Sequence, residues 1–469
     1  MSKLVGTIRE AMQLCGLKDG MMLSFHHHLR NGDHVLNMVL AEAAALGVKD
    51  LCVQASSLFD VHSPLIDHIA SGVVTDIETD YLSGRLGRAI SEGKMAKPVL
   101  FRSHGGRPDA IDTGRVKIDI AFIAAPAADI QGNANGVHGP SACGSLGYAC
   151  SDARHAAKVV VITDHLMPYP VHPAPIEETD VDCVVKVDSI GDPKGIVSGT
   201  TRITRDPVGL LIAKYAAQTI AHSGLLKDGF SFQTGAGGAS LAVTQYLKPL
   251  MKQKNITGSF GLGGITGYLV EMLEEGYFEK LMDVQCFDLR AVQSIRDNPK
   301  HIEVSASRYA SPSARSAAVN SLDTVVLGAT EIDTDFNVNV HTDSNGLIMG
   351  GSGGHSDTAA GAKLSIIVAP LFRARLPIVV DKVLCVTTPG DTVDVLVTQR
   401  GIAVNPRRAE LAQRLKDAKL PVYDIHELKD MAQRLTGVPA PARMGEQVVA
   451  TVEYRDGRVI DQIRSMARA

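Results

Sequence analysis

The fold is decided by a stretch of sequence that occurs twice. Residues 119–135 read DIAFIAAPAADIQGNAN, and residues 323–339 read DTVVLGATEIDTDFNVN. Each copy is an apolar, β-rich run followed by an Asp/Asn-rich turn, and the two align at one constant offset without a gap. The sequence therefore predicts the same strand-and-turn unit in both halves of the chain. The identical pairs at this offset are Asp119 and Asp323, Ala125 and Ala329, Asp129 and Asp333, Asn133 and Asn337, and Asn135 and Asn339.

Further matches extend the repeat in both directions. Downstream, Ser151-Asp152 corresponds to Ser356-Asp357 at nearly the same offset, and upstream Asp19-Gly20 resembles Asp228-Gly229. We therefore predict two tandem lobes, residues 1–223 and 224–469, divided where Ser223-Gly224 ends a helix. Two similar lobes imply a ligand cleft between them.

Short apolar runs that alternate with glycine-rich turns and helical patterns indicate an α/β fold with mostly parallel sheets. A hairpin is expected around Arg455–Arg458, at the end of the second lobe. The expected strands are Lys117–Ala125, Lys158–Thr163, Asp182–Val187, Thr324–Gly328, Leu364–Ala369 and Pro377–Val386, and one expected helix is Pro207–Ile220.

The amino-acid composition excludes several classes of protein. The 469 residues carry 47 Lys and Arg against 51 Asp and Glu, and 45% are hydrophobic, which is typical of a folded globular chain. The lack of a basic excess and the low aromatic content argue against nucleic-acid binding. Seven dispersed cysteines without a Cys-x-x-Cys pair indicate reduced thiols. With no apolar leader and no apolar run near 18 residues, we expect a cytoplasmic protein without a membrane span.

Three glycine-rich segments suggest a binding site in the second lobe. They are Ser231–Ser240, Ser259–Thr266 and Met349–Asp357, each read as a strand end followed by a loop, and the first leads into an expected helix, Leu241–Met251. Backbone N–H groups at such a helix start can receive an anion or an oxyanion, although a tight turn would need the same glycines. No segment has the ending of a P-loop or an acidic ribose partner, which disfavours nucleotide hydrolysis and hydride transfer.

Basic donors follow two expected strands of the first lobe. His26, His27, His28 and Arg30 follow one strand, and Arg107 follows another. They could bind a polycarboxylate, because a guanidinium pairs a carboxylate in bidentate fashion; a solvated loop and a metal site at the histidines remain alternatives. The repeated turn residues are read first as Asx-turns and caps. They are Asp129, Asn133, Glu331, Asp333 and Asn337, of which Glu331 could also act as a base or nucleophile.

The chain resembles the family of citrate lyase alpha subunits over essentially its whole length, and more broadly the CoA transferases. The resemblance implies two tandem CoA-transferase-like α/β lobes with the active site in the cleft between them. The stretches that carry it are Ser24–Asp33, His104–Arg107, Ala121–Pro126, Gly144–Ala149, Ser198–Pro207, Ser231–Ala242, Gly261–Tyr268, Gly328–Val340 and Gly350–Asp357.

The resemblance also implies a reaction. A citrate carboxylate attacks the acetyl thioester of a carrier's phosphopantetheine-type arm, giving a mixed anhydride, and the freed thiolate then attacks the citryl carbonyl and releases acetate. Glutamate-dependent CoA transferases form a covalent thioester instead, but the corresponding stretch Gly261–Gly267 contains no carboxylate. The expected enzyme is thus a citrate CoA-transferase that binds no cofactor or metal of its own.

Site roles follow as expectations. Oxyanion donors would come from Gly235, Gly237, Gly238, Gly263 and Gly264. Substrate binding would use His27, His28, Arg30, Arg107, Gln233, Gly350, Gly351, Gly353, Gly354, Ser356 and Asp357, with the last two bracing their loop.

Partners and alternatives complete the expectations. The resemblance implies citrate, an acetyl-carrier or acetyl-CoA, the beta and gamma (acyl carrier) subunits of the lyase, and a homo-oligomer. Three alternatives stay open: a CoA transferase for another acid such as citramalate, a non-catalytic scaffold that binds the carrier, and a sugar-phosphate isomerase of similar topology.

Overall fold

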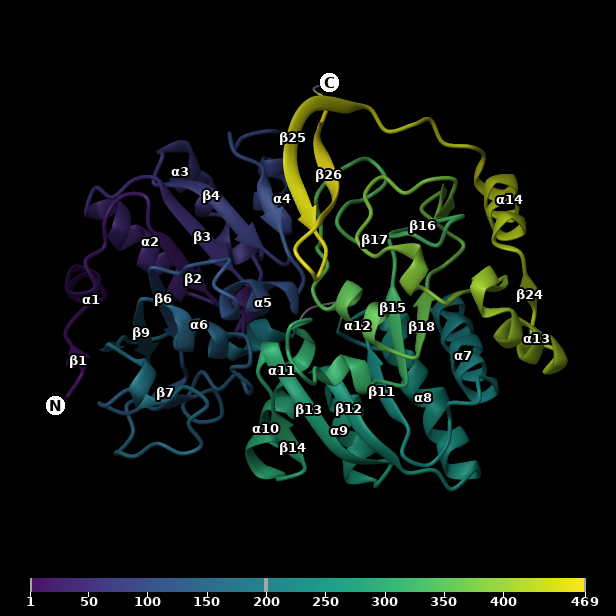
Figure 1. Cartoon of the computed structure of the whole chain (residues 1–469), viewed down its shortest axis with the longest axis horizontal. Coiled ribbons are helices and arrows are strands. Elements are labelled where there is room, and N and C mark those ends of the chain that lie inside the picture. The colour runs from purple at the N-terminus through teal and green to yellow at the C-terminus, as the bar shows by residue number, and fades with distance from the viewer. Residues whose placement is uncertain (1, 198–200, 468–469) are drawn as a thin grey trace.

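The computed structural model describes residues 2–197 and 201–467. It contains two large sheets, one in each lobe, with helices packed around them (Figure 1). The first sheet has the strand order β1-β10-β9-β6-β2-β3-β4-β5-β25-β26. Its strands are β1 (Leu4–Val5), β2 (Met22–Phe25), β3 (Leu51–Ala55), β4 (Val74–Thr79), β5 (Val99–Phe101), β6 (Ile120–Ala124), β9 (Lys158–Thr163), β10 (Cys183–Lys186), β25 (Met444–Glu453) and β26 (Val459–Met466).

The second sheet has the order β14-β13-β12-β11-β15-β18-β22-β23-β24, and all neighbours except β22 and β23 are parallel. Its strands are β11 (Ser231–Thr234), β12 (Gly258–Ile265), β13 (Phe278–Cys286), β14 (His301–Glu303), β15 (Thr324–Gly328), β18 (Leu364–Val368), β22 (Val395–Thr398), β23 (Gly401–Val404) and β24 (Val422–Tyr423). The mixed α/β class with mostly parallel sheets is therefore confirmed.

Helices separate most of the strands. Those between strands of the first sheet are α1 (Ile8–Leu14), α2 (Val35–Ala45), α3 (Leu65–Ala70), α4 (Gly84–Ser91), α5 (Gly106–Asp112) and α6 (Ala149–His155). Those that follow are α7 (Pro207–His222), α8 (Gly238–Gln253), α9 (Gly267–Glu274), α10 (Leu289–Asp297), α11 (Ala306–Ala310), α12 (His355–Gly361), α13 (Ala409–Asp417) and α14 (Ile425–Thr436).

The predicted repeat is present in three dimensions. The order from β10 to β5 in the first sheet is the order from β22 to β14 in the second. Asp119 Oδ2 accepts a hydrogen bond from Met22 N at 2.7 Å, and its counterpart Asp323 accepts one from Ser231 N at 2.9 Å. Each aspartate thus ties the start of a central strand to the strand beside it.

The repeated Asp/Asn turns are also equivalent. Oδ2 of Asp129 accepts a hydrogen bond from Nδ2 of Asn133 at 2.9 Å. Oδ2 of Asp333 accepts the equivalent hydrogen bond from Nδ2 of Asn337 at 3.1 Å. Both carboxylates also accept backbone N–H groups within their own turn. These residues stabilise the turns in which the chain reverses, which is the role that the sequence predicted first.

Two expected elements differ from the structure. Pro377–Val386 forms only the two-residue strands β20 (Leu376–Pro377) and β21 (Val379–Val380), outside both large sheets, because the proline lacks an N–H for a ladder. The position equivalent to β10 is filled by β22 instead. The glycines of Ser259–Thr266 form the parallel strand β12, with a β-bulge between Gly263 and Gly264, and not a loop.

The division between the lobes also differs from the prediction. Helix α7 packs against α8 and against β18 and β22 of the second sheet, so the second lobe begins before residue 207 and not after residue 223. Thr204 N already donates to Gly238 O at 3.1 Å. Ser198, Gly199 and Thr200, in one of the family-like stretches, lie outside the described residues.

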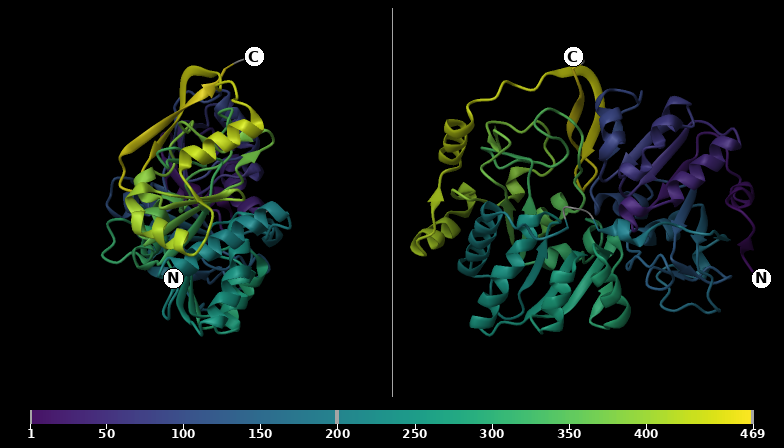
Figure 2. Two further views of the ribbon diagram at one scale, coloured as in Figure 1. Left: turned by 90° about the vertical axis from the view of Figure 1, so that its right-hand side faces the viewer. Right: turned by 180° about the vertical axis from the view of Figure 1, so that it is seen from behind.

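The C-terminal hairpin forms where expected but belongs to the other lobe. After α14 the chain crosses back, and β25 pairs in parallel with β5, with Ala450 beside Val99 (Figure 2, right). The hairpin β25–β26 therefore extends the first sheet, because β5 offers an unpaired edge there. Within the described ranges, no helix is long and apolar enough to cross a lipid bilayer.

Glycines permit the close contact between the lobes. A Cβ atom on Gly147 would stand 2.3 Å from the carbonyl oxygen of Val304, and one on Gly351 would stand 2.2 Å from that of Asp80. A Cβ on Gly105 would meet the carbonyl oxygen of Ala310 at 2.3 Å. The neighbouring atoms are backbone atoms, so they cannot move aside as a flexible side chain could.

We predict that Gly147→Ala lowers the free energy of unfolding by about 1–3 kcal/mol, because the added methyl group overpacks a backbone contact. Gly328→Ala is the control, since a Cβ there meets nothing within 4 Å. Chemical denaturation of both variants checks this. Equal stability of the two would show that the lobes can separate at residue 147 without loss.

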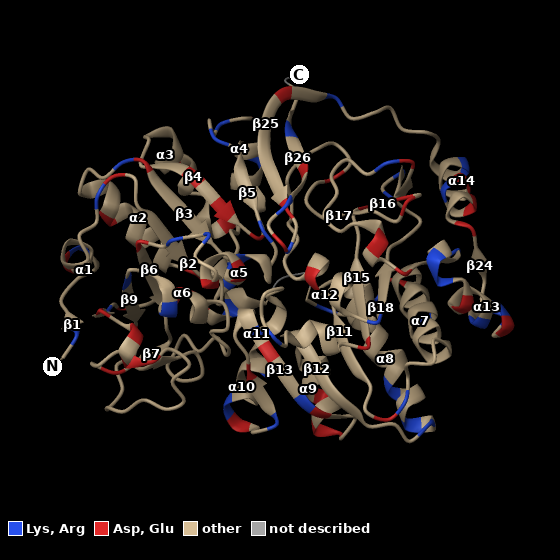
Figure 3. Ribbon diagram, in the orientation of Figure 1, with Lys and Arg blue, Asp and Glu red and all other residues tan. Residues whose placement is uncertain are grey.

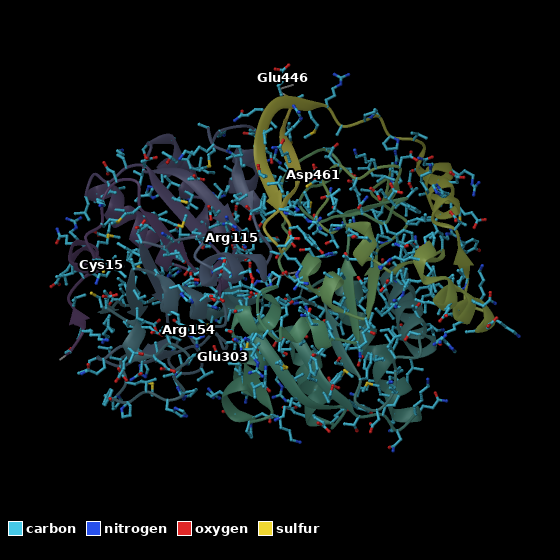
Figure 4. The ribbon with its side chains drawn as sticks, viewed as in Figure 1. Cys15, Arg115, Arg154, Glu303, Glu446 and Asp461 are labelled. Atoms are coloured by element: carbon cyan, nitrogen blue, oxygen red, sulfur yellow. The ribbon has the colours of Figure 1, made fainter. Side chains whose placement is uncertain are left out.

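The hairpin gives a second prediction. Asp461 on β26 accepts the N–H of Val386 from the second lobe at 2.7 Å, whereas Glu446 on β25 lies at the outer end of the hairpin (Figure 4). Asp461→Ala should lower the free energy of unfolding by about 1 kcal/mol through the lost hydrogen bond. Glu446→Ala should leave it unchanged, and an equal effect of both would contradict the assigned contact.

Candidate active site

A cavity of about 420 Å³ lies between the two lobes. Loops after β2, β3, β4 and β5, together with Tyr148, form its first-lobe wall, and segments after β11 and β15 form much of the other. Six predicted site residues do not line it: His28, Arg107, Gly238, Gly263, Ser356 and Asp357. The predicted residues that do are His27, Arg30, Gln233, Gly235, Gly237, Gly264, Gly350, Gly351, Gly353 and Gly354.

The three consecutive histidines point to different sides of the chain. His27 faces the cavity, and its Nδ1 lies 2.6 Å from Ser56 Oγ. His26 and His28 do not line the cavity; their rings stack at 5.7 Å between centroids and are buried near the Arg107–Asp152 pair. Burial lowers the pKa of all three imidazoles well below the usual value. The substrate-contact role predicted for His28 is therefore not supported, because its buried ring does not line the cavity.

Arg30 is the cationic side chain of the cavity. Its guanidinium carbon lies 5.3 Å from the ring centroid of Phe59 and 4.8 Å from that of Phe287, so two aromatic rings hold it. Its Nε and Nη1 are buried and have no hydrogen-bond partner in the described structure. Burial lowers the pKa of this guanidinium, and an anionic ligand would offset the cost of that burial. The residue also has a φ of 51°, a strained value for a non-glycine residue.

Helix α8 points its N-terminus at the same cavity. Gly235, Ala236 and Gly237 line the cavity, Gly237 is the N-cap, and no side chain caps the first turn. The N–H groups of a first helical turn have no intrahelical acceptor and favour an anion. The N–H of Gly235 is not free, because it donates to Val326 O at 2.7 Å, so the predicted donor role of Gly235 is wrong.

Gly263 and Gly264 make room for side chains. A Cβ on Gly263 would stand 2.7 Å from Cδ of Gln233, whose Nε2 donates to the Tyr309 hydroxyl at 2.9 Å. A Cβ on Gly264 would stand 2.2 Å from the ring of Phe287, the aromatic ring next to Arg30. These two glycines therefore position Gln233 and Phe287, a function that the oxyanion interpretation did not anticipate.

The third glycine segment holds the lobes together. Gly350, Gly351, Gly353 and Gly354 line the cavity. The carboxylate of Asp357, which follows them, accepts hydrogen bonds from Gly105 N and Ser103 Oγ of the first lobe, both at 2.9 Å. Ser356 Oγ lies 2.8 Å from Ser352 Oγ. Ser356 and Asp357 thus brace the loop and the lobe contact and do not line the cavity.

Arg107 is fully engaged elsewhere. Its guanidinium contacts Asp152 at 2.6 Å, Gln54 Oε1 at 2.8 Å and Ser24 Oγ at 3.0 Å, and its side chain is 1% exposed. It does not line the cavity, so the predicted role in substrate binding is not supported. A buried ion pair of this kind holds the ends of β2, β3 and α6 together.

Several lining residues had no role predicted from the sequence, among them His104, Tyr148, Tyr309, Phe59 and Phe287. His104 Nδ1 lies 2.9 Å from Oδ2 of the buried Asp80. The ring of Tyr148 packs at a tilt against those of His104 and His27, with centroid distances of 4.5 and 4.7 Å. His104 and Tyr148 lie in family-like stretches, and that was the only signal that could have found them.

The cavity lining contains no Asp or Glu among the described residues. Figure 3 shows β11 and β15 free of charged residues, with most charges on the outer helices and loops. Glu331, the candidate nucleophile, accepts Asn339 Nδ2 at 3.1 Å and lies outside the lining. No group of three or more His, Cys, Asp or Glu suited to a metal occurs in the described part of the chain.

The fold of this chain is shared with malonate decarboxylase alpha subunits. That of Acinetobacter baumannii shares the fold, with a TM-score of 0.69, 16% identity and 93% of each chain covered. A crystal structure of a protein assigned as the alpha subunit of citrate lyase from Streptococcus mutans, in complex with citrate, matches with a TM-score of 0.98 and 52% identity, covering 100% of this chain and 92% of that one.

The sequence comparisons agree. The model of the family "Citrate lyase, alpha subunit" matches residues 1–466. The citrate lyase alpha chain of Klebsiella pneumoniae is 52% identical over 464 residues, covering 99% of this chain and 91% of the relative. That of Haemophilus influenzae is 50% identical over 461 residues, covering 98% and 92%. The chain therefore belongs to the family of citrate lyase alpha subunits, which confirms the predicted family and enzyme class.

Two arginines allow a matched prediction. Arg30→Ala should raise the Kd for citrate at least tenfold, because it removes the unpaired cation of the cavity, and should leave stability nearly unchanged. Arg107→Ala should instead lower the free energy of unfolding by about 3–5 kcal/mol, because Asp152 stays buried without its partner. Calorimetric titration with citrate and denaturation of both variants measure this. A weaker citrate affinity in a folded Arg107→Ala protein, with unchanged affinity in Arg30→Ala, would reverse the assignment.

Proposed function

We propose that this chain transfers a carrier thioester from acetate to citrate, as the transferase subunit of a citrate lyase. The observation that carries the proposal is the unpaired, buried guanidinium of Arg30 in a cavity whose described lining has no carboxylate. Such a cavity favours a polyanionic acid. Membership of the family and the citrate held by the Streptococcus mutans protein both support citrate as that acid.

The proposed reaction needs no carboxylate from the enzyme. A citrate carboxylate, ionised at neutral pH, attacks the acetyl carbonyl and expels the thiolate, which gives an acetyl-citrate anhydride. The thiolate then attacks the citryl carbonyl and expels acetate. The thioester is that of a phosphopantetheine-type arm on a carrier subunit or of CoA, and the chain itself needs no resident cofactor.

Both steps pass through tetrahedral oxyanions. The N-terminus of α8 supports their stabilisation, because its N-cap Gly237 lines the cavity and no side chain caps the N–H groups of the first turn. A preorganised donor of this kind contributes roughly 2.7–4 kcal/mol to the transition state. Exclusion of water by the walls of Tyr148, Tyr309 and Phe287 would protect the anhydride from hydrolysis.

The proposal extends to the subunits of the lyase. A chain of this family would work with a beta subunit that cleaves the citryl thioester and with a gamma subunit that carries the acyl arm. An arm reaching the cavity would pass the Gly350–Gly354 segment, where four of the five lining residues are glycines. The scaffold and isomerase alternatives gain no support, because the family of the chain points to citrate lyase and the cavity has the donors for acyl transfer.

The direct route predicts that the protein forms no covalent acyl adduct. After incubation with acetyl thioester and citrate, intact-mass analysis should show the unmodified mass, while citryl thioester and acetate accumulate. Borohydride treatment should likewise leave activity intact. A carrier-derived or acyl adduct on Glu331, or loss of activity in Glu331→Gln without loss of stability, would contradict the direct route. Assay with citramalate in place of citrate tests substrate choice in the same experiment.

A further inference from the structure

His104 and Asp80 form a pair of the kind that moves protons. Asp80 directly follows β4 and is buried, and its Oδ2 holds Nδ1 of His104 at 2.9 Å. The backbone fixes this arrangement from the other lobe: His104 N donates to Gly353 O at 2.8 Å, and Gly353 N donates to Asp80 O at 3.2 Å. The imidazole is therefore positioned by both lobes at once.

The second ring nitrogen of His104 lies beside Gly353 in the wall of the cavity. His104 lines the cavity, and a Cβ on Gly353 would stand 3.4 Å from its Nε2. The missing side chain at Gly353 thus leaves open the space beside Nε2. With Nδ1 held by Asp80, Nε2 is the atom that can exchange a proton with a ligand.

Charged and titratable groups of both lobes surround His104, and they include Arg102, which is paired with Glu78 and Glu453, and Arg455, which lies 3.6 Å from Asp357. Two carboxylates interact with the His104 ring: Asp80 of the same lobe and Asp357 of the other lobe. His27 and Tyr148 pack against the ring at 5.5 and 4.5 Å and carry no charge, because burial lowers the pKa of His27 and raises that of Tyr148. Arg107 lies beyond Asp80 and is paired with Asp152. Burial raises the pKa of Asp80 to about 6, so at neutral pH this carboxyl is ionised beside the ring.

The proposed reaction has a step that needs such a group. When citrate has added to the thioester, the intermediate can expel either the carboxylate or the thiolate, and the thiolate is the stronger base, with an ordinary thiol pKa near 8.5 against about 4 for a carboxyl. Expulsion of the sulfur is therefore the harder outcome. The phenols of Tyr148 and Tyr309 are poor donors, since burial raises both of their pKa values.

We propose that His104, oriented by Asp80, is the general acid and base for the carrier sulfur. As the C–S bond breaks, the Nε2 proton passes to sulfur, the electron pair of the bond stays on sulfur, and the ring becomes neutral. In the second step neutral Nε2 takes the proton back, and the thiolate attacks the citryl carbonyl and releases acetate. Protons and charge balance over the cycle. This assignment rests on the proposed function and adds a catalytic residue to it.

The leaving group provides the test. In full-length His104→Gln, citrate-dependent thiol release from an acetyl alkyl thioester, acetyl-pantetheine, should fall by about 10²–10⁴-fold. Release from phenyl thioacetate should fall less than tenfold, because thiophenolate leaves without a proton. His222→Gln is the matched control, an exposed histidine at the end of α7. Calorimetric citrate titration of His104→Gln should give the wild-type Kd.

Equal losses with both thioesters would overturn the acid–base role and leave His104 a structural residue. If His104→Gln lost the same rate with both thioesters and also bound citrate with a raised Kd, His104 would be a citrate-binding residue instead. Wild-type protein without citrate-dependent thiol release would contradict the proposed function itself, which keeps the two failures apart.

Asp80→Asn tests the positioning residue. Loss of the carboxylate destabilises the imidazolium, so the falling limb of the rate profile with acetyl-pantetheine should move to lower pH, while the phenyl thioacetate profile stays in place. A uniform rate loss with no displacement of the pH profile would overturn the role assigned to Asp80.

Discussion

The lobes meet backbone against backbone, and the cavity depends on that contact. Positions 105, 147 and 351 admit no side chain, because carbonyl oxygens of the facing lobe lie within 2.3 Å of where a Cβ would stand. Asp357 then joins the lobes through Gly105 N and Ser103 Oγ. This approach brings Arg30 and His104 of one lobe opposite the helix start of the other, and neither lobe contains the whole site.

The cavity is cationic because the structure around it neutralises every nearby basic side chain of the first strand end except one. Arg107 and Asp152 cancel each other in the interior of the first lobe, and burial keeps His26 and His28 uncharged. Arg30 is left as the cation without a carboxylate partner, held by two aromatic rings. A cavity of this kind selects for negative charge in its ligand and places it next to the first turn of α8.

Much of the fold could be predicted from the sequence, because duplication leaves matched residues at a constant offset. Asp119 and Asp323 were found in this way, and they make the same hydrogen bond in both lobes. The hairpin could not be assigned to its lobe, because pairing with β5 is a contact between residues about 350 positions apart that no local pattern encodes. Helix α7 was misplaced for the same reason, since its packing partners lie later in the chain.

The site was predictable only in part, because sequence shows residue types and not the direction in which they point. Arg30 and Arg107 look equivalent as basic residues after strands, yet one faces the cavity and the other lies in a buried ion pair. Gly263 and Gly264 matched the pattern of an anion-binding loop, but a parallel strand with a bulge uses the same glycines to seat Gln233 and Phe287. Asp80 and His104 belong to different strand ends, and only the sheet brings them together.

The return of the C-terminal hairpin to the first sheet means that the polypeptide passes between the lobes twice, once ahead of α7 and once after α14. A single flexible tether would let the halves swing apart, whereas two crossings at separate places oppose such rotation. If the gene were cut at codon 223, the fragment with the second lobe would carry β25 and β26, which belong to the first sheet. The two fragments would therefore have to reassemble before the first sheet was complete.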